Sequence, residues 1–356
     1  MINIGVKTYD IRDFFDETFV KEYKEVVIDY RKILDTNLPT VKNDGNTTSN
    51  TKLIKWIEKR TGKDFSYLYN KGQKEYQYDY KFVMAAYEYL DSINMDETWD
   101  LKSLNNKDVI PNLSSLSLMY SPPGLTGGSD GTLDKPAGLP YYLMTDKINE
   151  VCLKKLIEEF PYMCNSLDDI CWKTDEWEGH MIAMPKGAFM SIHRDGTDDR
   201  PFTILNYINT DRRLEDGGVY RYFIDKDYDV EDKESLDWSK YPDYVYYKSI
   251  LHEDVENVKS LRYKYHNPPN KTPEYLESLD IFKNHNQHNI VSNYTTVSIM
   301  LHKNIKTKEQ DKKYFGLETP PSSDFEGEQG IPHLVTKNKS DEVRYTLYRR
   351  VVWRDS

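Results

Sequence analysis

The feature that most constrains the fold is a change of pattern near residue 179. Before it, apolar residues recur at the spacing of helix turns, and after it the chain carries short runs rich in β-branched and aromatic residues. Glycine, aspartate, asparagine and proline separate these runs, as turns separate strands. Helices followed by many short strands favour an α+β fold, a β-sandwich or barrel with a helical support, over an alternating α/β fold.

We expect residues 1–178 to form a helical N-terminal region that packs on the strands. Apolar stripes at helical spacing lie at about 19–34, 53–57, 80–90 and 147–160. Thr145 is expected to cap the last helix and Pro161 to stop it. Residues 121–138 are rich in Gly, Pro and Ser, and a loop of this length in a compact domain tends to be a lid or a link.

Residues 179–356 carry the predicted strands. The runs typical of strands are HMIAM, FMSIH, FTILNYIN, GVYRYF, YVYYK, NYTTVSIML and VRYTLYRRVVW. The segment from about 225 to 325 is polar and rich in Tyr, Lys and Asp, so we interpret it as an insertion between strands.

Composition narrows the classes of function. The net charge of −11 argues against a broad nucleic-acid-binding face, because such binding depends on Lys and Arg that neutralise phosphates. No apolar stretch is long enough to span a membrane and the N-terminus lacks a signal-peptide pattern, so we expect a cytoplasmic protein. Three cysteines without a CxxC pair fit that compartment, since they indicate reduced thiols.

The sharpest local motif is His193-Arg194-Asp195. Residues i and i+2 of a strand share a face, so His193 and Asp195 can converge on one atom. An imidazole and a carboxylate are two of the three ligands in the 2-His-1-carboxylate arrangement that holds Fe(II) with open positions. The same triplet opens the protein-kinase catalytic loop, but Arg200 stands where a kinase needs asparagine, and no HExxH zinc motif is present.

Further segments follow this motif in a fixed order. They are RPFTILNYIN at 200–209, DGGVYRYF at 216–223, IPHLV at 331–335 and VRYTLYRRVVW at 343–353. The ordered series resembles the Fe(II)/2-oxoglutarate-dependent oxygenases, most closely their prolyl-hydroxylase-like branch. The resemblance covers about 179–223 and 329–353, and it implies a double-stranded β-helix (jelly-roll or cupin-like) catalytic core over 179–356.

The resemblance implies that His193, Asp195 and His333 ligate Fe(II). His333 is favoured as the distal ligand because Arg344 lies eleven positions beyond it, in the range where the family places its cosubstrate arginine. The histidines that compete with it are His302 and, as weaker alternatives, His285 and His288. Only lysines follow His302 at a useful distance.

The resemblance also implies a site for the cosubstrate 2-oxoglutarate, formed by Arg344, Thr346 and Tyr207. Arg344 and Thr346 share a strand face, and a planar guanidinium matches a carboxylate through two parallel hydrogen bonds. A tyrosine common in the branch is replaced by Met184, so one contact to the cosubstrate is expected to differ. The pair Gly217–Gly218 would form a tight turn.

The implied activity uses Fe(II), 2-oxoglutarate and O2 to hydroxylate an aliphatic C–H bond of an amino acid, a peptidyl residue or a related small metabolite. Asp195 leaves no vacant position for a halide, which favours hydroxylation over halogenation. One alternative is an oxygenase that acts on a nucleobase, with Tyr246, Tyr247 and Tyr265 stacking on bases. The other is a jelly-roll binding module without enzymatic activity. Nothing in the sequence indicates an oligomeric state.

Overall fold

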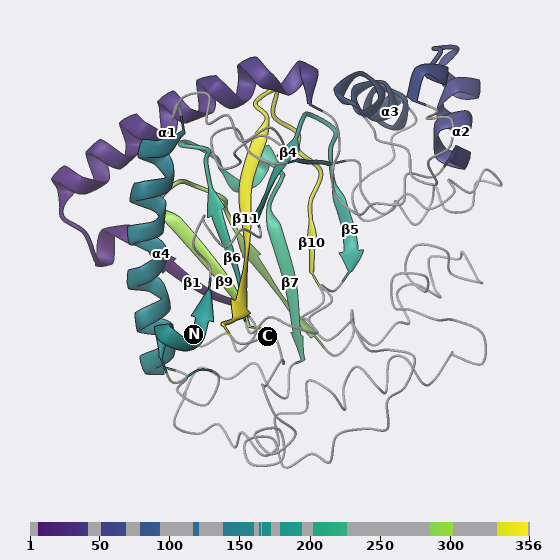
Figure 1. Cartoon of the computed structure of the whole chain (residues 1–356). Helices are drawn as coiled ribbons and strands as arrows, with labels where there is room; N and C mark the ends of the chain where they lie inside the picture. The colour runs from purple at the N-terminus through teal and green to yellow at the C-terminus, as the bar shows by residue number, and fades with distance from the viewer. Residues whose placement is uncertain are drawn as a thin grey trace.

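The computed structural model describes the parts of the chain that form its regular elements (Figure 1). The described residues are 6–41, 51–68, 79–92, 117–120, 138–159, 164, 166–171, 179–193, 202–225, 285–301 and 333–354. In the predicted loop 121–138 only Gly138 is described, and the strand-like run YVYYK lies outside these ranges.

Four α-helices are described, and all four predicted helices are present. They are α1 (Glu17–Asn37), α2 (Thr51–Thr61), α3 (Tyr80–Ser92) and α4 (Leu139–Glu159). Short 3-10 turns lie at Ile11–Asp13, Leu38–Thr40, Ser66–Leu68, Leu167–Asp169 and Leu214–Asp216. The Asp16 side chain caps α1 by accepting a hydrogen bond from the Phe19 amide at 2.8 Å. The predicted apolar stripe is the face that α1 buries, through Tyr23, Val27, Tyr30 and Leu34.

The predicted cap at Thr145 is wrong. Helix α4 begins at Leu139, so Thr145 lies inside it, fully buried, with its hydroxyl 3.3 Å from the Tyr23 hydroxyl. Pro140 suits the first turn of a helix, because the missing N–H has no partner there in any case. The end of α4 at Glu159 agrees with the predicted stop at Pro161.

The described strands form two antiparallel sheets. The main sheet has the order β1-β9-β6-β11-β4-β2, with β3 pairing on β11. Its strands are β1 (Val6–Asp10), β2 (Leu118–Tyr120), β3 (Ile170–Cys171), β4 (Gly179–Met184), β6 (Phe202–Tyr207), β9 (Thr296–Leu301) and β11 (Arg344–Trp353). The second sheet has the order β5-β10-β7-β8. Its strands are β5 (Met190–His193), β7 (Tyr220–Asp225), β8 (His285–Ile290) and β10 (His333–Val335).

From β4 to β11 the chain passes back and forth between the two sheets. Strands β4, β6, β9 and β11 belong to the main sheet, and β5, β7, β8 and β10 belong to the second one. The result is a mixed protein of helices and antiparallel sheets, and the strand order is consistent with the expected jelly roll.

The predicted insertion at 225–325 is too long. Strands β8 and β9 both fall inside it and pair with β7 and β6. The sequence of β8, HNQHNI, gives little apolar signal because, among the described strands, β8 stands at the edge and is held by backbone hydrogen bonds to β7 on one side. The N-terminal region is likewise not purely helical, since β1, β2 and β3 join the main sheet.

Helices α1 and α4 cover one face of the main sheet, which we call the outer face (Figure 1). On β11, Tyr345 donates a hydrogen bond to Asp35 of α1 at 2.7 Å, and Arg349 pairs with Asp146 of α4. The alternate residues of β11 lie on the opposite, inner face. Tyr220 of the second sheet reaches this inner face, because its hydroxyl lies 2.7 Å from the Met300 sulfur of β9. None of the helices in the described ranges combines the length and apolarity needed to cross a membrane.

Candidate functional site

The second sheet brings two predicted metal-binding positions together. On the antiparallel strands β5 and β10, His193 and His333 are direct partners in the register. Directly opposite residues of such a pair share a face of the sheet. The register shifts between His333 and Val335, and such irregularities are over-represented next to active sites. Two positions that are 140 residues apart in the sequence therefore become neighbours.

The environment of His333 is aromatic and buried. The side chain is 3% exposed, and its ring stacks on Tyr220 with the centroids 5.1 Å apart. On the neighbouring strand β7, Tyr222 is the register partner of His333, and on β8 His288 is the register partner of Tyr222. The rings of Tyr222 and His288 stack with their centroids 5.1 Å apart. His288 is thus separated from His333 by a whole strand.

The complete set of predicted iron ligands stays a prediction. Asp195 and the alternative His302 lie outside the described residues, and His193 and His285 are described by their backbone alone. Within the described ranges, no three His, Cys, Asp or Glu side chains form a cluster that could hold a metal ion.

The main sheet places Arg344 at the first position of β11, opposite Met184 of β4. Arg344 is 2% exposed, and the described groups that contact its guanidinium are neutral. Its Nε and Nη2 atoms lie 3.4 and 3.2 Å from the Ser292 hydroxyl, Nη1 lies 3.3 Å from the Met184 sulfur, and the guanidinium lies 5.5 Å from the Tyr207 ring. No carboxylate of the described residues forms an ion pair with it.

This burial has an electrostatic consequence. Desolvation lowers the pKa of Arg344 to about 10, the nearby Tyr207 opposes the shift, and Arg212 adds to it. Arg344 is still charged at neutral pH. The inner face of the sheet therefore holds a buried cation without a described counter-ion.

Thr346 and Tyr207 lie beside Arg344 on the same face. They are direct partners in the register of β11 and β6. The Thr346 hydroxyl is buried and has no hydrogen-bond partner, whereas the Tyr207 hydroxyl donates to Ser298 at 3.1 Å. A carboxylate accepts hydrogen bonds only, so an unpaired hydroxyl and a guanidinium fork form a donor set that fits one.

Two further residues contact the Arg344 guanidinium and were not identified from the sequence as its partners. Ser292 contacts Arg344 from the turn between β8 and β9, in the segment interpreted as an insertion. Met184 was identified as a departure from the family pattern, and its sulfur now contacts the Arg344 guanidinium. No sequence signal marks Ser292, because its role depends on where β8 and β9 pair.

The predicted glycine turn is confirmed. Gly217 and Gly218 have φ angles of +66° and +59°, which favour glycine. A Cβ atom on Gly218 would stand 2.9 Å from Cδ of Arg344. Glycine is required here because the chain passes against the buried arginine.

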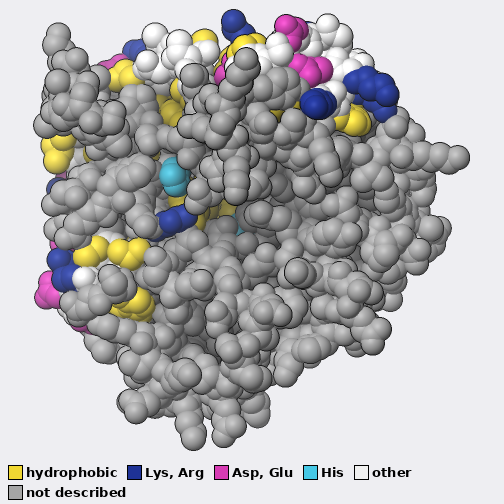
Figure 2. Space-filling model, turned by 45° about the vertical axis from the view of Figure 1, so that its right-hand side comes forward, with side chains coloured by type: hydrophobic (Ala, Val, Ile, Leu, Met, Phe, Trp, Pro, Cys, Tyr) yellow, Lys and Arg dark blue, Asp and Glu magenta, His cyan; other side chains and the backbone are white. Residues whose placement is uncertain are grey.

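Tyr220 connects the two halves of the site. Its ring stacks on His333 of the second sheet, and it is among the groups that influence the pKa of Arg344 on the main sheet. Figure 2 shows a histidine, a basic side chain and hydrophobic side chains near one another on one face of the molecule. Positions 193 and 333 thus lie on the second sheet, and the predicted cosubstrate residues lie on the main sheet.

Neither a scan against protein-family profiles nor a search of the curated proteins finds a match. Among solved structures, the chain is similar to a prolyl-4-hydroxylase from Pseudomonas putida, with 13% identity, 76% of this chain and 84% of that chain covered, and a TM-score of 0.31. It is similar to a Trichoplax adhaerens prolyl hydroxylase in complex with a hypoxia-inducible-factor peptide fragment, with 11% identity, 96% of each chain covered and a TM-score of 0.32. It is also similar to a viral collagen prolyl hydroxylase from Paramecium bursaria Chlorella virus-1 in its 2-oxoglutarate complex, with 10% identity, 72% and 92% covered and a TM-score of 0.30. All three of these solved structures are described as prolyl hydroxylases.

Proposed function

We propose that this protein is an Fe(II)- and 2-oxoglutarate-dependent dioxygenase with a double-stranded β-helix core formed by β4 to β11. Its substrate would be an amino acid, a peptidyl residue or a related small metabolite, and the reaction would hydroxylate an aliphatic C–H bond of that substrate. The observation that carries this proposal is the buried guanidinium of Arg344, whose described contacts are all neutral. An uncompensated buried charge costs several kcal/mol, so its presence is best explained by an anionic ligand.

The ligand we propose for Arg344 is the distal carboxylate of 2-oxoglutarate. The guanidinium would hold it through two parallel hydrogen bonds, and the unpaired Thr346 hydroxyl would donate a third. The Tyr207 ring, 5.5 Å from the guanidinium, would help to orient it, and the Tyr207 hydroxyl donates to Ser298. A monocarboxylic 2-oxo acid would leave both donors unsatisfied, and such mismatches are strongly disfavoured in buried sites.

His193, Asp195 and His333 would hold the Fe(II) ion, which, when bound, supplies the activation of O2 that is coupled to decarboxylation of 2-oxoglutarate. The pairing of positions 193 and 333 supports this assignment, as does the burial of His333. Tyr220 orients the His333 ring by stacking on it, and aromatic packing on this side limits the access of water.

The proposal is tested by adding Fe(II) and 2-oxoglutarate to the purified protein without oxygen. We expect a visible charge-transfer absorption that requires both additions and that Arg344→Met removes at the same 2-oxoglutarate concentration. The control is Arg213→Met, an exposed arginine in the neighbouring loop. A folded wild-type protein without this absorption would show the assignment to be wrong.

Turnover separates the remaining alternatives. Release of succinate together with O2 uptake, even without substrate, excludes a binding module. Screening of free amino acids and peptides for stimulated succinate release would then identify the substrate class. Stimulation by single-stranded oligonucleotides instead would favour the nucleobase alternative.

A further inference from the structure

A second buried arginine lies against the first. Arg212 is 4% exposed and precedes the turn that contains Gly217 and Gly218. A Cβ atom on Gly218 would stand 2.9 Å from Nη2 of Arg212 and also 2.9 Å from Cδ of Arg344. The two arginine side chains therefore approach each other across a position that only glycine can occupy.

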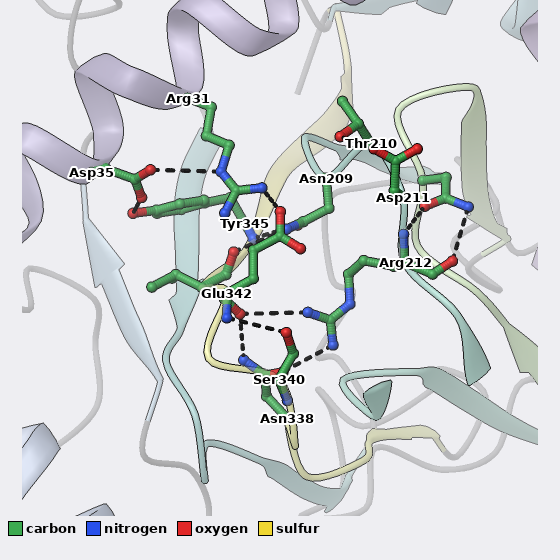
Figure 3. Close-up of polar contacts among 12 residues, drawn as sticks. Arg31, Asp35, Asn209, Thr210, Asp211, Arg212, Asn338, Ser340, Glu342 and Tyr345 are labelled. Carbon is green, nitrogen blue, oxygen red and sulfur yellow. Dashed lines mark hydrogen bonds and ion pairs between the residues drawn. The ribbon is translucent and has the colours of Figure 1, made fainter. Parts of the chain in front are cut away.

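In the described part of the chain, the guanidinium of Arg212 donates only to neutral acceptors, as that of Arg344 does. Figure 3 shows the contacts of Arg212 with Asn338 and Glu342. Nη2 donates to the carbonyl oxygens of Asp216 and Gly217 at 3.1 and 2.7 Å and to Oδ1 of Asn338 at 2.9 Å. Nη1 lies 3.5 Å from the Glu342 carbonyl oxygen. Burial lowers the pKa of Arg212, and the Asp216 carboxylate opposes this shift.

These acceptors belong to the segments that surround Arg344. Asn338 also donates to the carbonyl oxygens of Met184 and Glu342, both at 2.9 Å, and Met184 is the register partner of Arg344. The backbone of Arg212 exchanges two hydrogen bonds with the Asn293 side chain, at 2.9 and 3.3 Å. Asn293 follows Ser292, which contacts Arg344 directly. Arg212 thus connects three loops that adjoin Arg344.

The loop before β11 also makes contacts that do not involve Arg212. Asn209 donates to the Val343 carbonyl oxygen at 2.9 Å and accepts from the Tyr345 amide at 3.0 Å, so it brackets Arg344 on both sides. Arg31 of α1 pairs with Glu342 (Figure 3). Because these contacts remain when Arg212 is replaced, its charge can be tested separately from the fold.

The charge of Arg212 needs a separate explanation. A neutral amide could donate to the same carbonyl oxygens without the desolvation cost of a buried cation. Two neighbouring buried cations repel each other, and the pair becomes favourable when an anion binds beside it.

We propose that Arg212 is a positioning residue for the cosubstrate, which orients Arg344 and adds a second positive charge that selects a 2-oxo dicarboxylate over a 2-oxo monocarboxylate. This inference rests on the proposed function. It predicts a specific loss, because only a ligand with a distal carboxylate interacts with the additional charge.

The test compares Arg212→Met and Arg212→Lys with the wild type. Dissociation constants are measured by anaerobic calorimetric titration of the Fe(II)-loaded protein with 2-oxoglutarate and with 2-oxopentanoate, which has a methyl group in place of the distal carboxylate. We expect Arg212→Met to weaken 2-oxoglutarate binding by about tenfold and to leave 2-oxopentanoate binding within about twofold. Arg212→Lys keeps the charge and is expected to retain 2-oxoglutarate binding within about threefold.

Thermal unfolding of each variant and the exposed control Arg213→Met complete the design. Equal weakening of both ligands in Arg212→Met would show that Arg212 is merely structural and would overturn the inference. Unchanged 2-oxoglutarate binding in that variant would overturn it as well. A wild-type protein that binds neither 2-oxo acid would contradict the proposed function itself.

Discussion

Strand β11 carries two fully buried arginines that meet opposite environments. Arg344 and Arg349 are both 2% exposed, and because they are five positions apart they lie on opposite faces of the main sheet. Arg349, on the outer face, pairs with Asp146 of α4 and lies 5.9 Å from the Tyr142 ring. Arg344, on the inner face, has neutral described contacts only.

The difference separates a structural charge from a binding charge. The cost of burying Arg349 is offset inside the fold, by a carboxylate from a packed helix. The cost of burying Arg344 is not offset among the described residues, so the positive charge of Arg344 is available to bind an anionic ligand. The two arginines are equally buried, so burial does not tell a structural charge from a binding charge. The charge of the groups that contact each arginine does.

The largest expected effect is on Arg344. Arg344→Met should weaken 2-oxoglutarate binding by at least about 100-fold, because two charge-assisted hydrogen bonds are lost. The free energy of unfolding should stay the same or rise, since an uncompensated buried charge is removed. Anaerobic absorption titrations and urea denaturation measure the two quantities. Destabilisation with unchanged binding would mean that the charge of Arg344 is structural after all.

For Arg349 on the outer face, the second prediction is a loss of stability without a loss of 2-oxoglutarate binding. Arg349→Met should lower the free energy of unfolding by about 2–3 kcal/mol, less than for a fully buried pair because the Asp146 side chain is 25% exposed. Binding of 2-oxoglutarate to the folded protein should not change. The double variant Asp146→Asn/Arg349→Met should recover part of the stability. If the double variant is no more stable than Arg349→Met, the Arg349–Asp146 ion pair does not stabilise the packing on the outer face.

A smaller effect is expected at Thr346, where binding and stability should move in opposite directions. Thr346→Val keeps the side-chain volume and removes the unpaired hydroxyl, so the protein should be slightly more stable in urea denaturation. The dissociation constant for 2-oxoglutarate should rise by about five- to tenfold, because one hydrogen bond to a carboxylate is lost. A variant that binds as well as the wild type would remove Thr346 from the pocket.

The smallest effect is expected for Tyr207→Phe. It keeps the ring against Arg344 and removes the hydroxyl that donates to Ser298. We expect about a threefold weakening of 2-oxoglutarate binding and a loss of about 1 kcal/mol of stability. Tyr207→Leu, which removes the ring, should weaken binding more than Tyr207→Phe does. Equal effects of the two substitutions would show that the ring does not orient the guanidinium.

Local patterns predicted the helices and most strands. The stripe of α1 and the alternation of β11 arise from residues near in sequence, so a short window contains the signal. Strand β8 was missed because its stability comes from pairing with β7 and not from its own apolar residues. Thr145 was misplaced because its hydroxyl is satisfied by Tyr23 of another helix, a contact that no local pattern contains.

In the candidate site, too, some residues have a local sequence signal and others depend on tertiary contacts. Arg344, Thr346 and Tyr207 were predicted from motif and alternation, and they are neighbours in the fold. Ser292 and Arg212 were not predicted, because each lies near Arg344 only when strand pairing brings together segments more than fifty residues apart in the sequence.

The sequence by itself determined which residues carry charge and which share a strand face, because side-chain chemistry and a two-residue period are local properties. Only the tertiary structure decided which buried arginine is neutralised. Arg349 and Asp146 lie 203 positions apart and become partners only when α4 packs on the outer face of the sheet. Arg344 faces the second sheet, where the described contacts of its guanidinium are neutral. Electrostatic compensation depends on spatial neighbours, and these are set by packing.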